Sequence, residues 1–479
     1  MIAAPPPEPH APRLLLTNAA SIFTFGSRKP LIADAQDAAY SPDGTLIAFA
    51  RRGDLWLANA DGSGQRRLVA TPHVVEYRPS WLPSGDGIVY PADLGDRRII
   101  RIVQLPKGPS NRIASSNGEE YGATVSHAGR IAFVSTRDGV PELFVSEPTG
   151  AMPVPFDTTP PAQPLADPHD LAWAPGGTTL AYDATLQDGT TALVLDDGTT
   201  QTILPGFSNP VYSPQGTRIA VTTATGLGSI APDGTGVRQL GPGKPLDWRV
   251  VPIGTPLYPN LVQLPPSGLV LEHIGKHWTL GFTSMVDNRG PGILWIHATR
   301  PVGSKIMNVR QFVQLASGAV RVDPVSGGLK YVNAPPHHHW HFLGFDRYEL
   351  RSASDFKLIV RDYKSGFCIA DHYGTAIGVK HGPPRFLGNC AQFDPEAREV
   401  TEGSSVGYTD RYPAFFHGQQ LDITKVPAGR YWLVHRANED FHLRERSYSD
   451  NTASLLIRLA WRGGVPIVTP LRACHRERC

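Results

Sequence analysis

Three histidines at alternate positions, His337, His339 and His341, are the residues of this chain best suited to chemistry. On an extended strand successive side chains point to opposite faces, so these three share one face while His338 and Trp340 take the other. Three imidazoles with no thiolate nearby suit a borderline, nitrogen-loving metal, and copper leads the divalent affinity order. The pattern therefore predicts a metal site. The alternative is a polar, histidine-rich loop without metal.

The spacing of these histidines sets a geometric requirement. At about 3.3 Å per residue, a straight strand would hold the outer two histidines roughly 13 Å apart, too far to share one ion comfortably. We therefore expect the strand to twist or bulge here. The preceding Pro335 and Pro336 favour such an irregularity.

The composition indicates a globular protein of several domains. A chain of 479 residues with 41% hydrophobic and 18% charged residues is too long for one ordinary domain. Its 48 glycines and 45 prolines favour many short strands joined by turns. A formal net charge of +2 gives no reason to expect a nucleic acid partner. No apolar run is long enough for a transmembrane segment, and no signal peptide is visible at the N-terminus.

The first half contains an internal repeat. One unit recurs every 40 to 50 residues or so, the spacing of propeller blades. Most copies read as a strand, a Pro-x-Gly turn and an apolar strand. The five copies occupy residues 39–49, 80–90, 125–133, 172–182 and 211–221.

A sixth unit is split between two distant segments. Residues 14–17, 21–25 and 29–32 are expected to form its last three strands, and residues 245–250 its first. Such a closure removes the exposed sheet edge. The repeats resemble the six-bladed propeller of TolB-type proteins, whose Ser-Pro-Asp-Gly signature is complete at residues 41–44. No catalytic constellation is found here, and Asp54, Asp61 and Asp138 are interpreted as turn residues.

A second domain is expected after the proline-rich linker at residues 255–266. Strand patterns occupy residues 279–288, 293–296, 309–315, 356–361, 431–434 and 454–460. We expect an all-β chain with a tail at 1–12, a six-bladed β-propeller at 13–252, and a β-sandwich-like domain with long loops at 253–479.

Four motifs of this domain, in order, resemble the bacterial form of the lysyl oxidase family between about Leu257 and Trp461. They are the three alternate histidines, Lys364-Ser-Gly-Phe-Cys368, Asp410-Arg-Tyr412 followed by Leu421-Asp-Ile-Thr424, and Ser449-Asp-Asn-Thr452. The resemblance implies that His337, His339 and His341 bind copper. It also implies that Lys364 and Tyr412 form the cofactor lysyl tyrosylquinone.

The family's activity would be the oxidative deamination of primary amines, either peptidyl lysine in a protein substrate or small amines. Dioxygen is the oxidant, and the products are an aldehyde, hydrogen peroxide and ammonia. Lys364 must add to the oxidised ring as a neutral amine, so we expect desolvation or the metal's charge to depress its pKa. Asp410 is the candidate base, with His372 and His417 as weaker candidates. An ordinary turn carboxylate is the competing interpretation of Asp410.

The four cysteines lie in the last third, which indicates disulfides and an oxidising, extracytoplasmic location. The resemblance implies a disulfide between Cys368 and Cys390. Cys474 and Cys479 are left open between a small C-terminal loop and free thiols. One departure from the family is the segment between Lys364 and Tyr412, which is longer than in its animal members.

Two other functions compete with the oxidase. In the first, the chain is a binding protein: the propeller holds a protein partner and the copper domain is structural or inactive. In the second, the three histidines hold the zinc of a hydrolase with an open fourth position. The zinc hypothesis leaves Lys364 and Tyr412 unexplained.

Overall fold

The computed structural model describes residues 10–18, 20–113, 116–147, 153–156, 165–252, 254–334, 337–362, 366–375, 379, 382–414 and 420–479. The chain folds into two compact units, Pro9–Ile253 and Gly254–Cys479. The expectation of an all-β chain is confirmed, because every regular element among the described residues is a strand. These residues contain no helix long and apolar enough to cross a membrane.

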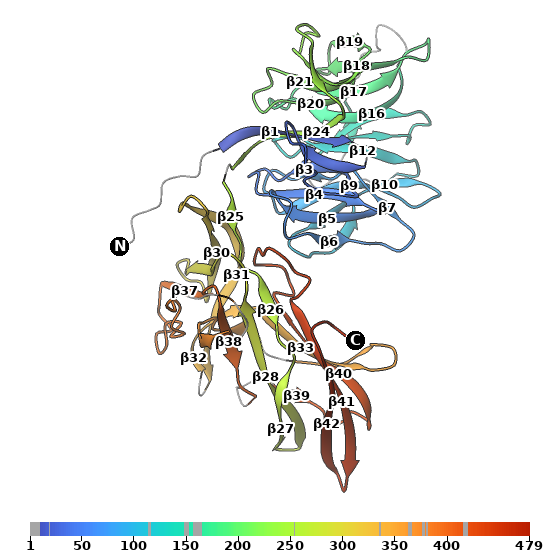
Figure 1. The fold of residues 1–479 in the computed structure, drawn as a ribbon. Helices are drawn as coiled ribbons and strands as arrows, with labels where there is room; N and C mark the ends of the chain where they lie inside the picture. Colours follow the sequence, from blue (N-terminus) through green and yellow to red (C-terminus); the bar gives the residue numbers. More distant parts are fainter. Residues whose placement is uncertain are drawn as a thin grey trace. The chain divides into compact units, whose positions relative to one another are not determined.

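The first unit is a six-bladed β-propeller (Figure 1). Five blades are antiparallel sheets built from consecutive strands. They are β3 (Gln36–Tyr40), β4 (Leu46–Arg51), β5 (Asp54–Asn59) and β6 (Arg66–Val69); β7 (Val75–Glu76), β8 (Ser80–Trp81), β9 (Gly87–Asp93), β10 (Arg98–Gln104) and β11 (Ser110–Arg112); β12 (Glu120–Val125), β13 (Ile131–Ser135), β14 (Glu142–Ser146) and β15 (Val154–Pro155); β16 (Ala166–Trp173), β17 (Leu180–Thr185), β18 (Thr191–Asp196) and β19 (Gln201–Pro205); and β20 (Ser208–Tyr212), β21 (Ile219–Thr223), β22 (Gly226–Ile230) and β23 (Arg238–Gly241).

The sixth blade closes the ring with strands from both ends of the unit, as predicted. Its sheet has the order β2 (Ser21–Thr24), β1 (His10–Asn18), β24 (Lys244–Pro252). The strand expected at residues 29–32 is reduced to one bridge between Ile22 and Ile32. Leu15 of β1 is fully buried in the cluster that joins this blade to the first blade.

The Ser-Pro-Asp-Gly turn of the first blade shows why its residues are needed. The Ser41 hydroxyl accepts from the Leu46 amide at 2.9 Å, and the Asp43 carboxylate accepts from the Thr45 amide at 3.1 Å. Gly44 has φ +69°, and a Cβ there would lie 2.7 Å from the Val251 Cα of β24. Only glycine combines this conformation with so close an approach of the next blade.

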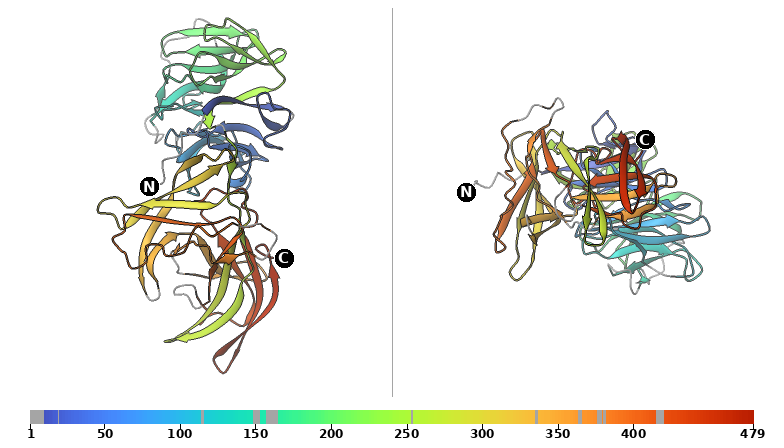
Figure 2. Two further views of the ribbon diagram at one scale, coloured as in Figure 1. Left: turned by 60° about the vertical axis from the view of Figure 1, so that its left-hand side comes forward. Right: turned by 90° about the horizontal axis from the view of Figure 1, so that it is seen from below.

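The second unit consists of three antiparallel sheets, seen from two further sides in Figure 2. The first contains β35 (Gly366–Phe367), β32 (His337–Leu343), β31 (Val320–Ala334), β30 (Ile306–Leu315), β29 (Leu294–Thr299) and β37 (Glu399–Ser404), with β25 (Pro256–Leu257) on β30. The second contains β26 (Leu261–Gln263), β28 (His277–Asn288), β38 (Tyr408–Tyr412) and β36 (Tyr373–Gly374), with β27 (Ser267–Ile274) and β39 (Leu421–Asp422) on β28. The third contains β34 (Leu358–Arg361), β33 (Asp346–Ser352), β40 (Gly429–Ala437), β41 (Thr452–Arg462) and β42 (Val465–Cys474).

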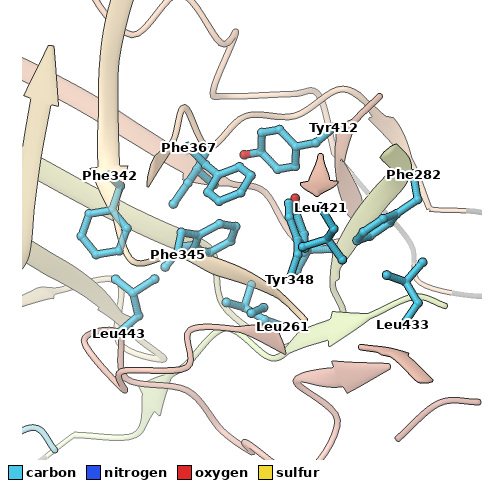
Figure 3. Packing of buried hydrophobic residues seen from close by; sticks show 14 of the residues in the cluster. Leu261, Phe282, Phe342, Phe345, Tyr348, Phe367, Tyr412, Leu421, Leu433 and Leu443 are labelled. Atoms are coloured by element: carbon cyan, nitrogen blue, oxygen red, sulfur yellow. The ribbon is translucent and has the colours of Figure 1, made fainter. Parts of the chain in front are cut away.

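All three sheets contribute to one apolar core (Figure 3). Phe367 comes from the first sheet, Phe282 and Tyr412 from the second, and Tyr348 and Leu433 from the third. The Phe282 and Tyr348 rings meet edge to face with their centroids 4.8 Å apart. The core therefore brings residues from the three sheets around the Tyr412 ring.

Candidate active site

The histidine motif lies on β32, which pairs with β31 on one side and with the short edge strand β35 on the other. The Nε2 atoms of His339 and His341 are 2.8 Å apart, and His341 is buried. On the opposite face Trp340 is buried, and His338 Nδ1 lies 2.8 Å from Asn333 Oδ1. The His337 side chain lies outside the described residues.

Of the twist or bulge expected to bring His337 and His341 together, the bulge is not present in this strand. β32 pairs with β31 from Phe342 to His337 without a register shift. The pleat already places alternate residues on one face, and side-chain reach brings the His339 and His341 ring nitrogens together.

A loop and a short strand flank the histidine strand. β35 pairs with its end, with Phe367 opposite Phe342. The loop residue Cys390 accepts a hydrogen bond from the Trp340 amide at 2.9 Å. Cys368 and Cys390 form a disulfide, so the segment after β35 and the loop are covalently joined beside the histidines. Cys474 and Cys479 form a second disulfide, which resolves the alternative left open for them.

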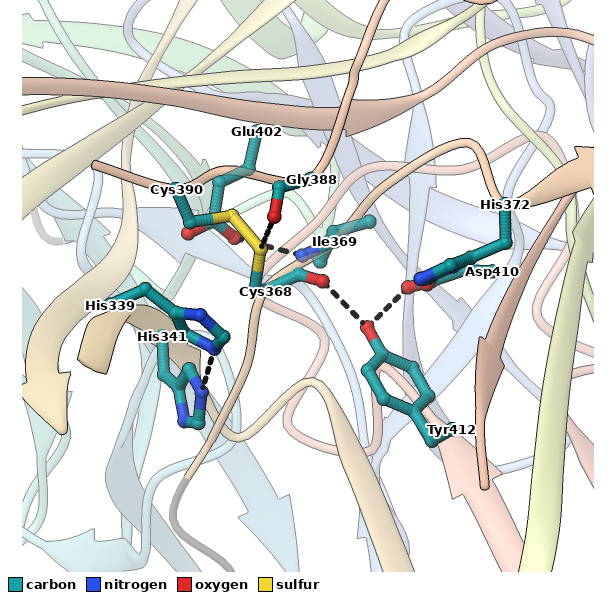
Figure 4. Close-up of a disulfide and its surroundings, with 10 residues drawn as sticks. All are labelled: His339, His341, Cys368, Ile369, His372, Gly388, Cys390, Glu402, Asp410 and Tyr412. Carbon is teal, nitrogen blue, oxygen red and sulfur yellow. Dashed lines mark hydrogen bonds and ion pairs between the residues drawn. A yellow bond between two sulfur atoms is a disulfide. The ribbon is translucent and has the colours of Figure 1, made fainter. Parts of the chain in front are cut away.

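Tyr412 ends β38 and faces the same segment (Figure 4). Its side chain is 3% exposed, and its ring packs on Phe367 with the centroids 4.5 Å apart. The hydroxyl lies within hydrogen-bond distance of two acceptors, the Asp410 Oδ2 and, at 3.1 Å, the Cys368 carbonyl oxygen. The histidine strand therefore pairs with Phe367, and the Tyr412 side chain contacts the Phe367 ring and the Cys368 carbonyl.

The Tyr412 phenol contacts the Asp410 carboxylate, which in turn lies beside the His372 imidazole. Asp410 is buried, and its Oδ1 lies 2.9 Å from Nδ1 of His372, whose side chain is 41% exposed. The hydrogen bond to Asp410 raises the pKa of His372. Burial raises the pKa of Asp410, and burial together with that carboxylate raises the pKa of Tyr412 well above its ordinary value.

Two predicted residues, Lys364 and His417, lie outside the described residues. The described neighbours of Lys364 are both buried: Asp362 precedes it by two positions, and Gly366, two positions later, pairs with Leu343 of β32. Neither carboxylate oxygen of Asp362 has a hydrogen-bond partner among the described residues. Burial raises the pKa of this carboxyl to about 6.

Sequence reasoning missed Glu402. This residue of β37 is 1% exposed, and one of its oxygens accepts from the Ile369 amide at 3.1 Å. Its carboxylate lies within 4.8 Å of the disulfide sulfurs, and burial raises its pKa well above the ordinary value. The available signal was alternation, because Val400, Glu402 and Ser404 share the buried face of the strand.

The propeller unit has its own cavity of about 770 Å³, lined by the innermost strands of all six blades. Asp37, Arg78, Asp170 and Asn209 line it in the left-handed backbone conformation, with φ from 44° to 54°. Arg78 reaches from the second blade to Asp170 of the fourth. Beneath them Asp183 is 1% exposed and accepts from the Asn209 amide at 2.8 Å.

Three solved structures resemble part of the chain at low identity. TolB from Acinetobacter baumannii has 16% identity and a TM-score of 0.42, covering 50% of this chain and 66% of that chain. A putative TolB from Agrobacterium tumefaciens has 21% identity and a TM-score of 0.35, covering 42% and 83%. A nidogen/laminin complex has 10% identity and a TM-score of 0.41, covering 50% and 98%.

No curated protein matches the chain. A family model described as lysyl oxidase matches residues 305–465. The match contains the three histidines, both cysteines of the Cys368–Cys390 disulfide, and the Asp410-Arg-Tyr412 motif. Residues 305–465 therefore form a lysyl oxidase domain within the C-terminal unit.

Proposed function

We propose that the chain is a copper-dependent amine oxidase that converts primary amines, peptidyl lysine or smaller amines, to aldehydes. The lysyl oxidase domain supports an oxidoreductase. The finer proposal is supported by one observation: the strand that carries His339 and His341 pairs with Phe367 through Phe342, and the Tyr412 phenol contacts the Phe367 ring and the Cys368 carbonyl. Tyr412, Lys364 and Asp410 are the proposed catalytic residues.

The described histidines fit copper. Imidazole nitrogens without a thiolate suit copper among the divalent metals. The Nε2 atoms of His339 and His341 lie 2.8 Å apart, so both are within reach of one ion. His337 is proposed as the third ligand. When bound, copper would supply the oxidation by dioxygen that converts Tyr412 into the quinone partner of Lys364.

The chain's own residues would then handle protons and position. Asp410 touches the Tyr412 hydroxyl and is the proposed base for the substrate's α-proton. The Cys368 carbonyl orients the phenol, and the Cys368–Cys390 disulfide holds that carbonyl beside the histidine strand. The packed Phe367 ring excludes water from one face of the tyrosine.

The propeller is proposed to bind the amine-bearing substrate or a protein partner through its central cavity, whose lining carries both charge signs. The two disulfides support an extracytoplasmic location, since such bonds persist in oxidising compartments. The binding-protein alternative keeps this cavity as the working site. It differs in predicting no turnover.

Phenylhydrazine labelling of copper-loaded protein, together with peroxide release on lysine-type amines, tests the proposal. The wild type should form a coloured adduct and release peroxide. Tyr412→Phe should do neither while still binding copper. Tyr373→Phe, which removes a phenol from the neighbouring strand β36, is the matched control and should behave as the wild type. Copper-loaded wild-type protein without adduct or peroxide would favour the binding protein.

A further inference from the structure

Three residues form a continuous chain from the buried phenol to solvent. Tyr412 is 3% exposed and Asp410 1% exposed, whereas the side chain of His372 is 41% exposed. The Tyr412 hydroxyl contacts Asp410 Oδ2, and Asp410 Oδ1 lies 2.9 Å from His372 Nδ1. The His372 and Tyr412 ring centroids are 6.3 Å apart, so the carboxylate bridges two groups that do not touch directly.

We propose that Asp410 and His372 form a proton exit path for the Tyr412 hydroxyl during cofactor formation. Asp410 accepts the proton of the hydroxyl, and His372 passes a proton on to water. The inference rests on the proposed function, because it concerns conversion of Tyr412 into the cofactor. It assigns His372 a role distinct from that of a base for the substrate.

The proton balance is simple. The Tyr412 O–H bond breaks as an O–H bond forms on Asp410 Oδ2. That O–H bond then breaks as an N–H bond forms on Nδ1 of the neutral His372 imidazole, which accepts from the Arg411 amide at 3.1 Å in the structure. The resulting imidazolium releases its Nε2 proton to water. One proton leaves the site for each phenolate formed.

The alternative acceptor of the phenol is inadequate for this transfer. The Cys368 carbonyl can accept a hydrogen bond but cannot take the proton. Two other charged groups face the imidazole: Arg411 lowers the pKa of His372, and Asp371 raises it. The carboxylate of Asp371 already accepts from the Ser405 hydroxyl and the amides of Arg385 and Ser405, which fixes it in place.

The first test follows quinone formation after copper and dioxygen are added to copper-free protein. The wild-type rate should rise with pH through the pKa of His372, because the imidazolium must lose its proton. His372→Gln keeps a donor but cannot titrate, so it should slow formation at least tenfold and lose this pH dependence while binding copper normally. His297→Ala, a half-buried histidine bonded to Thr401, is the matched control and should match the wild type.

The second test needs no quinone. In copper-free protein with ¹³C-labelled histidine, the pKa of His372 should fall when Asp410→Asn removes the carboxylate. The ultraviolet absorbance of Tyr412 is isolated by subtracting the spectrum of a matched protein that carries Tyr412→Phe. Measured in this way, the pKa of Tyr412 should be lower in Asp410→Asn than in the wild type. A wild type that makes no quinone would defeat the proposed oxidase and leave these titrations to decide the path. The path is refuted if His372→Gln matures at the wild-type rate or if the His372 pKa ignores Asp410→Asn.

Discussion

The Tyr412 hydroxyl contacts a buried carboxylate. This carboxylate belongs to Asp410, and the hydroxyl also contacts the Cys368 carbonyl. The sequence allowed two interpretations of Asp410, a base or an ordinary turn carboxylate. The structure places it within β38, buried and in contact with the phenol, so the turn interpretation is wrong. Its role as base remains a prediction.

Asp410→Asn should lower amine turnover per quinone by about 100-fold, since positioned general bases contribute about 10²–10⁴ in rate. The variant keeps the side-chain shape and should bind copper as the wild type does. Peroxide release, divided by the phenylhydrazine-reactive fraction, is the measurement. Asp355→Asn, at an exposed turn of the same unit, is the control. Equal turnover per quinone in Asp410→Asn and wild type would remove Asp410 as the base.

Asp183 of the propeller should make stability fall as pH rises. Burial raises its folded pKa from 3.8 to about 7, so the folded chain binds more protons than the unfolded chain between these values. The stabilisation is complete below pH 4 and is lost as pH rises through 7, about 4 kcal/mol in all. Asp183→Asn, which keeps an acceptor for the Asn209 amide, should flatten this dependence. Urea unfolding at pH 4, 6 and 8 measures it, and parallel curves for the two proteins would contradict it.

At the scale of elements, the Cys368–Cys390 disulfide joins the two segments that flank the histidine strand. Alternation correctly predicted which face of residues 337–341 carries His339 and His341, because the period of a strand is a local property. The loop of residues 388–394 against this strand could not be predicted, since its hydrogen bonds to Trp340 and His338 depend on the tertiary fold. Alternation marks Glu402 as a residue of the buried face of β37, but its place beside the disulfide depends on the tertiary fold.

Replacing Cys368 and Cys390 by serine should cost about 3 kcal/mol of stability, because the bond closes a loop with a sequence separation of 22. It should also slow quinone formation, because the Cys368 carbonyl would no longer be held beside the histidines. The double serine variant at Cys474 and Cys479, with a separation of 5, is the matched control. It should cost about 2 kcal/mol and leave quinone formation unchanged. Denaturation and visible absorbance separate the two effects, and equal maturation in both variants would contradict the positioning role.

At the scale of the molecule, each unit forms its own core. The repeats predicted the blades well because each blade repeats the same turn chemistry, as Gly44 illustrates. Closure of the ring by β1 was also predicted, from strand patterns separated by more than 200 residues. The crossing of the cavity by Arg78 was not predictable, because it depends on which blades face one another.

Leu15→Ala should destabilise the propeller by about 2–5 kcal/mol, the usual cost of emptying a buried leucine site. Leu15 is fully buried where β1 closes the ring. Arg13→Ala changes an exposed residue of the same strand and should cost less than about 0.5 kcal/mol. Chemical denaturation of both variants is the measurement, and equal stability would mean that β1 contributes little to closure.

Mass spectrometry of copper-matured protein tests the central claim most directly. The oxidase predicts one cross-linked species that contains the peptides of Lys364 and Tyr412. That species should be absent from Tyr412→Phe and Lys364→Met, both of which should still bind copper. A matured wild type in which these two peptides are always recovered separately would contradict the claim.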